Sequence, residues 1–210
     1  MVKLETSTLR HWLLELPHVF EANLESLNQL DAKAGDGDHG TTMLRGLRAS
    51  AQAIDGLNGD NARTMLETAG TNLRRAAGGA SGPLFSSLFL ELGKVAEDDG
   101  LDLEGFTSGL SAAIAMIVKL GKAASGDRTM LDALMPAAEA AQTSSNTDVL
   151  TDVFKNVVNA ARGGMTATAS MVARKGRARN VNAGRVESPD AGATSILLIL
   201  ETLKRSVEAA

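Results

Sequence analysis

Apolar side chains recur every three or four residues along most of the chain, which is the period of an amphipathic helix. The stretch from about 7 to 30 shows it clearly, with Leu9, Trp12 and Leu16 on one side. Pro17 removes a backbone donor, so we expect a kink or an early helix boundary there. No stretch alternates apolar and polar residues as a half-buried strand does. The pattern therefore predicts eight helices and no strand.

The other seven predicted helices are separated by clusters of Gly, Asp and Asn, which are turn formers. We expect Asp102 to cap the fifth helix and Gly121 to end it in the left-handed conformation. Gly163 and Gly164 are expected to loosen the seventh. These seven helices span about 39–54, 61–77, 81–95, 102–121, 129–141, 147–173 and 193–207.

Composition agrees with an all-α fold. Aromatic residues make up only 3% of the chain, whereas strands are usually rich in aromatic and β-branched residues. Hydrophobic residues at 44% and charged residues at 22% argue against disorder. The 210 residues are enough for one core, so we expect a single domain over 1–210.

Charge and cysteine content exclude several classes of function. The net charge of −4 gives no overall attraction to nucleic acid or to an anionic membrane. No apolar run approaches the ~20 residues of a membrane span, and MVKLETSTLRHW lacks the apolar segment of a signal peptide. The absence of cysteine excludes disulfides, thiolate metal sites and cysteine nucleophiles. We expect a cytoplasmic protein.

Four junctions between predicted helices are unusually rich in glycine and charge. In an antiparallel array with short connections, every odd-to-even junction lies at the same end, so these four should meet there. The junctions near 55–60, 98–102 and 144–147 should lie at the opposite end. The four glycine-rich junctions are 34–40, 78–83, 121–130 and 174–195.

The first of these junctions contains three carboxylates, on Asp31, Asp36 and Asp38. A solvated turn is the simplest interpretation, since Asp and Gly favour turns. A binding role is favoured because Gly37 alone separates two of the carboxylates, which can then face one point. Asp31 also lies at a helix carboxyl end, where a negative charge needs a cation. The junction leads directly into a helix amino end, which is a natural phosphate site.

Oxygen ligands without a His or Cys cluster suit magnesium or calcium better than zinc. An EF-hand is excluded because Leu47 stands where its twelfth ligand should be. The dinucleotide fingerprint formally fits Gly35, Gly37 and Gly40, but it follows a helix and not a strand. No phosphate-binding loop of the Walker type surrounds Lys122.

The carboxylates would repel a bare phosphate by about 3 kcal/mol per charge pair, at about 6 Å and an effective dielectric near 20. Divalent cations reverse the sign of that interaction. The junction therefore indicates a carboxylate–magnesium–phosphate site, a chemistry suited to phosphoryl transfer.

Together the sequences GDGDHG, GGASGPLF, GKAASGDRTM, ARKGRA and DAGATS resemble the nucleotide-binding L subunit, or L domain, of dihydroxyacetone kinases. The similarity runs in order over essentially the whole chain. It implies a barrel of eight antiparallel amphipathic helices with a nucleotide, ADP or ATP, at one end. It also implies that Asp31, Asp36 and Asp38 bind two Mg²⁺ ions that bridge the phosphates.

The resemblance also implies nucleotide contacts from five segments of the chain. The family pattern has Asp-Pro-Gly-Ala where this chain has Asp190-Ala191-Gly192-Ala193; the lost Pro loosens that loop but removes no ligand. The implied contacts are His39, Gly40, Thr41, Thr42, Ala80, Ser81, Gly121, Met130, Arg177, Asp190, Ala191 and Gly192.

Several of these residues have other interpretations. His39 has a reference pKa near neutrality, so it is a candidate phosphohistidine or general base, although hydrogen bonding to phosphate or ordering of the loop is favoured. The basic cluster Arg174, Lys175, Arg177 and Arg179 lacks the aromatic partners of a nucleic-acid surface and is better read as phosphate-facing. No catalytic residue is assigned.

The resemblance implies that the chain acts with other proteins. A separate K subunit would hold dihydroxyacetone, and a phosphotransferase-system phosphocarrier subunit would recharge retained ADP. An ATP-dependent two-subunit kinase for a related ketose, such as a tetrulose, is the nearest alternative. A nucleotide-loaded regulator that binds a transcription factor is an alternative from another class.

Overall fold

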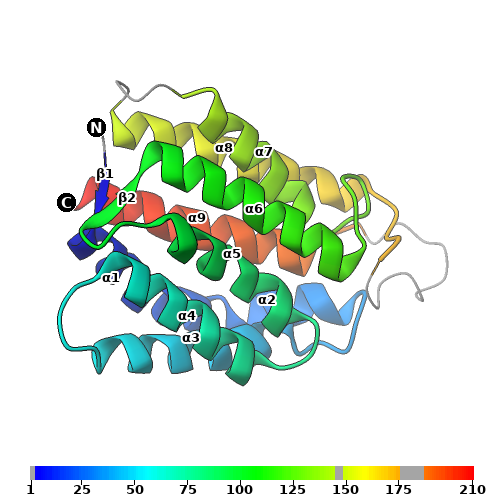
Figure 1. Ribbon diagram of the computed structural model, residues 1–210. Helices are drawn as coiled ribbons and strands as arrows, with labels where there is room; N and C mark the ends of the chain where they lie inside the picture. The colour runs from blue at the N-terminus through cyan, green and yellow to red at the C-terminus, as the bar shows by residue number, and fades with distance from the viewer. Residues whose placement is uncertain (1–2, 145–148, 176–186) are drawn as a thin grey trace.

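The computed structural model describes residues 3–144, 149–175 and 187–210, and over these the protein is all-α, as predicted. The described residues form nine α-helices, one 3₁₀ turn (η1, Thr168–Ser170) and two short strands (Figure 1). The helices are α1 (Thr6–Ala22), α2 (Leu24–Ala32), α3 (His39–Asp55), α4 (Ala62–Ala77), α5 (Ser81–Val95), α6 (Leu103–Gly121), α7 (Leu131–Gln142), α8 (Leu150–Ala167) and α9 (Ala191–Glu208).

The first predicted helix is two helices, and its break is not at the proline. Pro17 lies inside α1 and is buried. The chain leaves helical geometry at Asn23, whose side-chain amide donates to the carbonyl oxygen of Val19 at 2.8 Å. An Asn side chain competes with the helix for backbone groups in this way. The prediction of eight helices was therefore one short for the described residues.

The prediction of no strand was also wrong. Strands β1 (Lys3–Glu5) and β2 (Gly100–Asp102) pair antiparallel, with Leu4 opposite Leu101. A side chain on Gly100 would collide with the carbonyl oxygen of Leu4, so the pairing requires glycine there. Strands of three residues are too short to show an alternating pattern. They join the start of the chain to the turn between α5 and α6.

Three details of the later helices also differ from prediction. Asp102 caps α6 as expected, accepting from the Gly105 amide at 2.7 Å, but Lys122 and not Gly121 takes the left-handed conformation. Helix α8 ends at Ala167 and is not loosened at its glycines. A side chain on Gly164 would collide with the carbonyl oxygen of Asp132, so this glycine lets α7 and α8 approach closely. The expected start of this helix at 147 lies outside the described residues.

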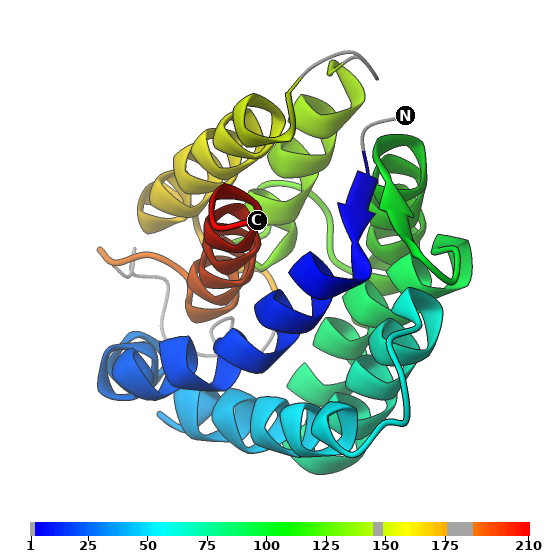
Figure 2. The same cartoon turned by 90° about the vertical axis from the view of Figure 1, so that its left-hand side faces the viewer.

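One cluster of buried apolar side chains draws on every helix from α1 to α9. Trp12 of α1 is 1% exposed and donates its indole N–H to the Ile199 carbonyl of α9 at 3.0 Å. Seen end-on, α9 lies between α1 and the pair formed by α7 and α8 (Figure 2). Both chain ends and the β1–β2 pair lie at one end of the bundle (Figure 1).

Helix α6 differs from the other described helices in its length and apolar composition. It has 19 residues, a mean hydropathy of 1.3, and only 33% of its apolar window buried. By length and composition it could cross a membrane, contrary to the expectation that no apolar run approaches that length, although core helices of soluble proteins pass the same test. Val118 and Leu120 are its exposed large apolar residues, at 38% and 51%.

Candidate functional site

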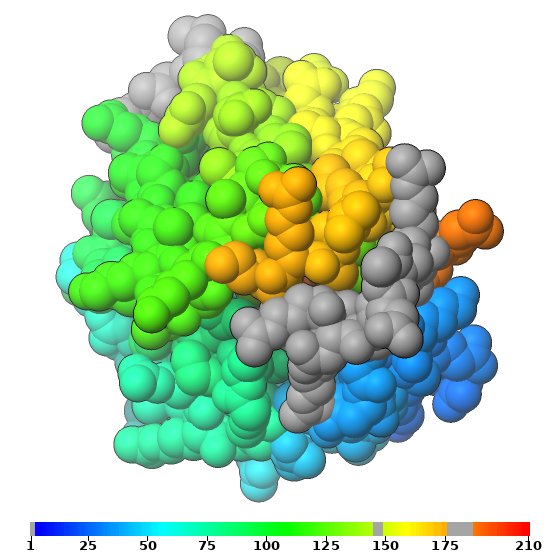
Figure 3. Space-filling view, turned by 90° about the vertical axis from the view of Figure 1, so that its right-hand side faces the viewer, coloured from blue at the N-terminus to red at the C-terminus, as the bar shows by residue number. Residues whose placement is uncertain are grey.

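The four glycine-rich junctions meet at one end of the bundle, as the alternation of helix directions predicts. They line one cavity of about 530 Å³. Figure 3 views this end of the molecule, opposite to the end that carries the strands. The predicted residues that line the cavity are Asp31, Asp36, Asp38, His39, Thr42, Ala80, Ser81, Gly121, Met130, Asp190, Ala191 and Gly192.

The three aspartates of the first junction lie close together, with one ligand oxygen from each within 4.8 Å of the others. Asp31 lies in the last turn of α2 and orders the loop, since its Oδ2 accepts from the amides of Gly37 and Asp38, each at 3.0 Å. A side chain on Gly35 would lie 2.6 Å from Asp31 Oδ1, so glycine allows the chain to fold over this carboxylate. Three carboxylates that face one point fit a hard divalent cation.

Helix α3 begins directly after these carboxylates, and only part of its first turn lines the cavity. Thr42 lines the cavity, whereas Gly40 and Thr41 are outside its lining. A side chain on Gly40 would lie 2.5 Å from the Leu24 carbonyl oxygen of α2. Thr41 is joined to Asn28 of α2 by two hydrogen bonds, of 3.0 and 3.1 Å. These two residues therefore hold α2 against α3.

His39 is buried at the cavity wall and is joined to two other helices. Its Nε2 lies 2.8 Å from Ser195 Oγ of α9, and its Nδ1 lies 3.5 Å from Ser81 Oγ of α5. Its ring is 5.7 Å from that of Phe85. Burial lowers the pKa of His39 from 6.5 to about 4, and the nearby Asp31 charge only partly opposes this shift. His39 is therefore neutral at physiological pH.

The second junction reaches the cavity through two glycines in the left-handed region, Gly78 with φ 73° and Gly79 with φ 56°. Arg45 of α3 fixes the carboxyl end of α4, which precedes these glycines. Its guanidinium donates to the carbonyls of Ala76 and Ala77 at 2.7 and 2.5 Å. A cation at a helix carboxyl end is favourable. Arg45 also lines the cavity and was not predicted, although it lies one turn after Thr42 on the same helix face.

The third and fourth junctions form the opposite wall. Asp190 caps α9, its Oδ1 accepting from the Ala193 amide at 2.8 Å. Burial raises the pKa of Asp190 from 3.8 to about 6, against the opposing effects of that hydrogen bond and of the Arg128 charge. The start of α9 lies against the third junction, since a Cβ on Gly192 would be 3.4 Å from Met130 Cβ, and it would be 3.0 Å from Asp190 Oδ1.

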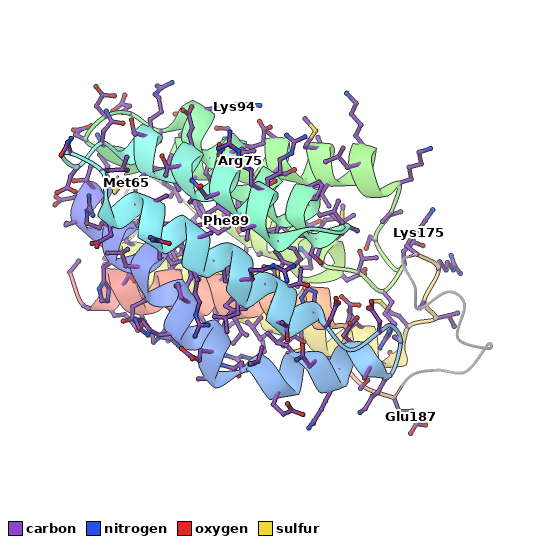
Figure 4. The ribbon with its side chains drawn as sticks, turned by 90° about the horizontal axis from the view of Figure 1, so that it is seen from below. Met65, Arg75, Phe89, Lys94, Lys175 and Glu187 are labelled. Carbon is purple, nitrogen blue, oxygen red and sulfur yellow. The ribbon has the colours of Figure 1, made fainter. Side chains whose placement is uncertain are left out.

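The basic residues at the cavity include one that the sequence predicted and one that it did not. Lys175 lines the cavity and lies at this end of the molecule with Glu187 (Figure 4). Arg177 and Arg179 lie outside the described residues. Arg128 also lines the cavity and was not predicted. Its φ of 62° and its long-range hydrogen bonds leave no signal in the sequence.

Known proteins with similar sequences include both whole subunits and parts of larger kinases. The chain is 38% identical over 184 residues to the L-erythrulose 1-kinase of Mycolicibacterium smegmatis, a match that covers 86% of this chain and 32% of that protein. It is 32% identical over 192 residues to the ADP-binding subunit of PEP-dependent dihydroxyacetone kinase 1 of Listeria innocua, covering 91% of this chain and 92% of that subunit.

Similar solved structures include the dihydroxyacetone kinase from C. freundii in complex with AMP-PNP and Mg²⁺. The match has a TM-score of 0.70 and 25% identity, and covers 94% of this chain and 33% of the kinase. Residues 33–205 match the DAK2 domain family, which is more than three quarters of the chain. The chain therefore belongs to the DAK2 domain family.

Proposed function

We propose that this chain is the nucleotide-binding subunit of a dihydroxyacetone kinase. The observation that carries the proposal is the convergence of three carboxylates, the amino end of α3 and the three other glycine-rich junctions on one cavity of about 530 Å³. The near-complete overlap with an ADP-binding subunit from L. innocua supports it. In this proposal the 210 residues act as one nucleotide-binding domain in the cytoplasm.

The aspartates fit the proposed metal by their chemistry and spacing. Two Mg²⁺ ions, when bound, would supply the positive charge that offsets the phosphates of ADP or ATP. Asp31 would bind metal through Oδ1, because its Oδ2 already accepts hydrogen bonds from two loop amides. Asp36 and Asp38 would complete the ligand set.

The remaining walls would hold the nucleotide itself. Thr42, Ser81 and the amide of Ala80 would face the phosphates, beside Gly78 and Gly79, whose lack of side chains leaves room for them. Leu84, Ile117 and Met130 offer an apolar surface for the base. Asp190, Ala191 and Gly192 would close the cavity from the side of α9. Gly40 and Thr41 would act indirectly, through the packing of α2 against α3.

Neutral His39 does not fit the role of a general base with a pKa near the working pH. Its two ring nitrogens face Ser195 of α9 and Ser81 of α5, so it would hold the starts of α3, α5 and α9 together around the phosphates. Phosphoryl transfer needs an acceptor placed in line with the phosphate. In this proposal a K subunit holds the ketose and docks over the cavity end.

We propose that ADP is a retained cofactor, recharged by a phosphotransferase-system phosphoprotein. Relatives named as ADP-binding subunits of PEP- or PTS-dependent kinases match over 92% to 98% of their length, which supports this choice. An ATP-using kinase for a tetrulose is the second candidate, favoured by the 38% identity to an L-erythrulose 1-kinase.

Native mass spectrometry of the purified protein tests the cofactor proposal. Retained ADP is the expected result, and a chain free of nucleotide under Mg²⁺ would contradict it. Turnover then separates the two candidates, with a K subunit and dihydroxyacetone or erythrulose as acceptor. A phosphotransferase-system donor should sustain phosphorylation of dihydroxyacetone while free ATP does not. Steady turnover of erythrulose on ATP alone would support the second candidate instead.

A further inference from the structure

Arg128 is the largest charged side chain among the fully buried ones of the described residues, at 2% exposed. It lies in the junction between α6 and α7 with φ 62°, in the left-handed region that a non-glycine residue seldom adopts. A buried guanidinium and a strained backbone both cost stability, so the arrangement needs a compensating role.

The hydrogen bonds of Arg128 join two distant parts of the chain. Its Nε donates to the carbonyl of Thr168 at 3.2 Å, and its Nη2 donates to the carbonyl of Ser188 at 2.9 Å. Thr168 follows the end of α8, and Ser188 comes two residues before the Asp190 cap of α9. One side chain therefore holds Thr168, which precedes Lys175 in the chain, and Ser188, which follows it.

Two further bonds tie these two parts of the chain to each other and to the same junction. The Asp190 amide donates to Thr168 Oγ1 at 2.8 Å, and the Arg174 amide donates to the Asp127 carbonyl at 3.2 Å. Thr168 is fully buried, so its bond with the Asp190 amide is largely shielded from water. Lys175 and Asp190, which both line the cavity, thus depend on the junction that carries Arg128.

The junction itself is rigid enough to fix Arg128. Asp132 accepts from the amides of Gly126 at 2.5 Å and Thr129 at 2.7 Å, and Asp127 accepts from the amide of Ala124 at 2.9 Å. Local carboxylate–amide bonds of this kind hold a loop in one conformation. Arg128 Nη1 has no partner among the described residues, so the guanidinium is held by the two carbonyls.

We propose that Arg128 is a positioning residue of the nucleotide site, which acts through the carbonyls of Thr168 and Ser188 to keep Lys175 and the start of α9 on the cavity wall. The inference rests on the proposed nucleotide-binding function. Lysine cannot replace arginine here, because an ammonium group lacks the planar fork that reaches two separate carbonyls.

Calorimetric titration with Mg-ADP tests the proposal on Arg128→Lys and Arg128→Ala, with Arg48→Lys and Arg48→Ala as controls. Arg48 lies on α3, outside the cavity lining, and pairs with Glu21. We expect both Arg128 variants to lose at least tenfold in affinity, and both Arg48 variants to stay within twofold of the parent. Circular dichroism verifies that each variant is helical. Methylguanidinium at millimolar concentration should restore part of the affinity of Arg128→Ala.

Hydrogen exchange separates positioning from a general structural role and does not depend on nucleotide. In Arg128→Lys, amides of the start of α9 and of residues 168–175 should exchange at least tenfold faster, while those of residues 36–42 keep the parent rate. Uniformly faster exchange, or Mg-ADP affinity within twofold of the parent in both Arg128 variants, would overturn the proposal. If the parent protein itself binds no Mg-ADP, the proposed function fails first.

Discussion

His39 of α3 and Ser195 of α9 are 156 positions apart in the sequence, yet His39 Nε2 lies 2.8 Å from Ser195 Oγ. Both side chains are buried. This bond connects the first turns of α9 to the helix that begins beside the carboxylates.

Ser195→Ala should weaken the site by removing the partner of His39 Nε2. A buried ring nitrogen without a partner costs about 1–2 kcal/mol, which we expect as a loss in the free energy of unfolding by urea. Mg-ADP affinity should also fall several-fold. Ser206→Ala is the matched control, a buried serine of the same helix whose hydroxyl donates to the Thr202 carbonyl. An equal loss of Mg-ADP affinity in both variants would show that Ser195 has no specific role at the site.

Asp38→Ala should abolish nucleotide retention without unfolding the protein. Loss of about 3 kcal/mol of charge compensation corresponds to an affinity loss on the order of 100-fold. The nucleotide-free variant should unfold at or above the parent temperature, because three like charges within 4.8 Å become two. Asp38 precedes the first residue of α3, and Asp55→Ala, at the other end of that helix, serves as control. Undiminished Mg-ADP affinity in Asp38→Ala would show that this carboxylate holds no metal.

Gly40→Ala should destabilise the protein by about 1–3 kcal/mol, because the new Cβ meets a backbone oxygen that cannot move freely. Gly163→Ala, in α8, has nothing within 4 Å of the added carbon and should gain about 0.5–1 kcal/mol. Chemical denaturation measures both free energies of unfolding. A stable Gly40→Ala variant that fails to bind nucleotide would assign Gly40 a direct contact with phosphate.

The nucleotide-free, metal-free protein contains two buried groups with opposite pH effects on stability. The lowered pKa of His39 makes the unfolded chain bind more protons between pH 4 and 6.5, so stability rises with pH there. The raised pKa of Asp190 makes the folded protein bind more protons between pH 3.8 and 6, so stability falls with pH there. Each effect amounts to about 3 kcal/mol at most.

Each group can be removed separately to reveal the other. In His39→Asn, stability should fall as pH rises from 4 to 6, and in Asp190→Asn it should rise over pH 4 to 6.5. The parent protein should change little over pH 4 to 6 by comparison. Urea unfolding in EDTA at several pH values measures this. Identical pH dependence in parent and both variants would contradict the burial of these two groups.

Local pattern predicted the elements of this fold better than its contacts. Amphipathic periods and turn residues located the helices, and the alternation of their directions correctly predicted that four junctions meet at one cavity. The break at Asn23 was missed because it depends on one side chain bonding its own helix. The β1–β2 pair was missed because it joins two three-residue segments far apart in the sequence.

The candidate site divides in the same way. Asp31, Asp36 and Asp38 could be identified because one short junction contains all three. Arg45 was recognisable in principle from helical spacing. Arg128 and Ser195 were not, because their partners lie 40 or more residues away and depend on how α8 and α9 cross the bundle.

Calorimetric titration with ADP, first in Mg²⁺ and then in EDTA, tests the central claim of a metal-dependent nucleotide site most directly. The protein is first freed of any nucleotide retained through purification. We predict tight binding in Mg²⁺ and an affinity loss on the order of 100-fold or more in EDTA, because three carboxylates then face the phosphates without a cation. Equal ADP affinity in Mg²⁺ and EDTA, or no binding in either, would contradict the account.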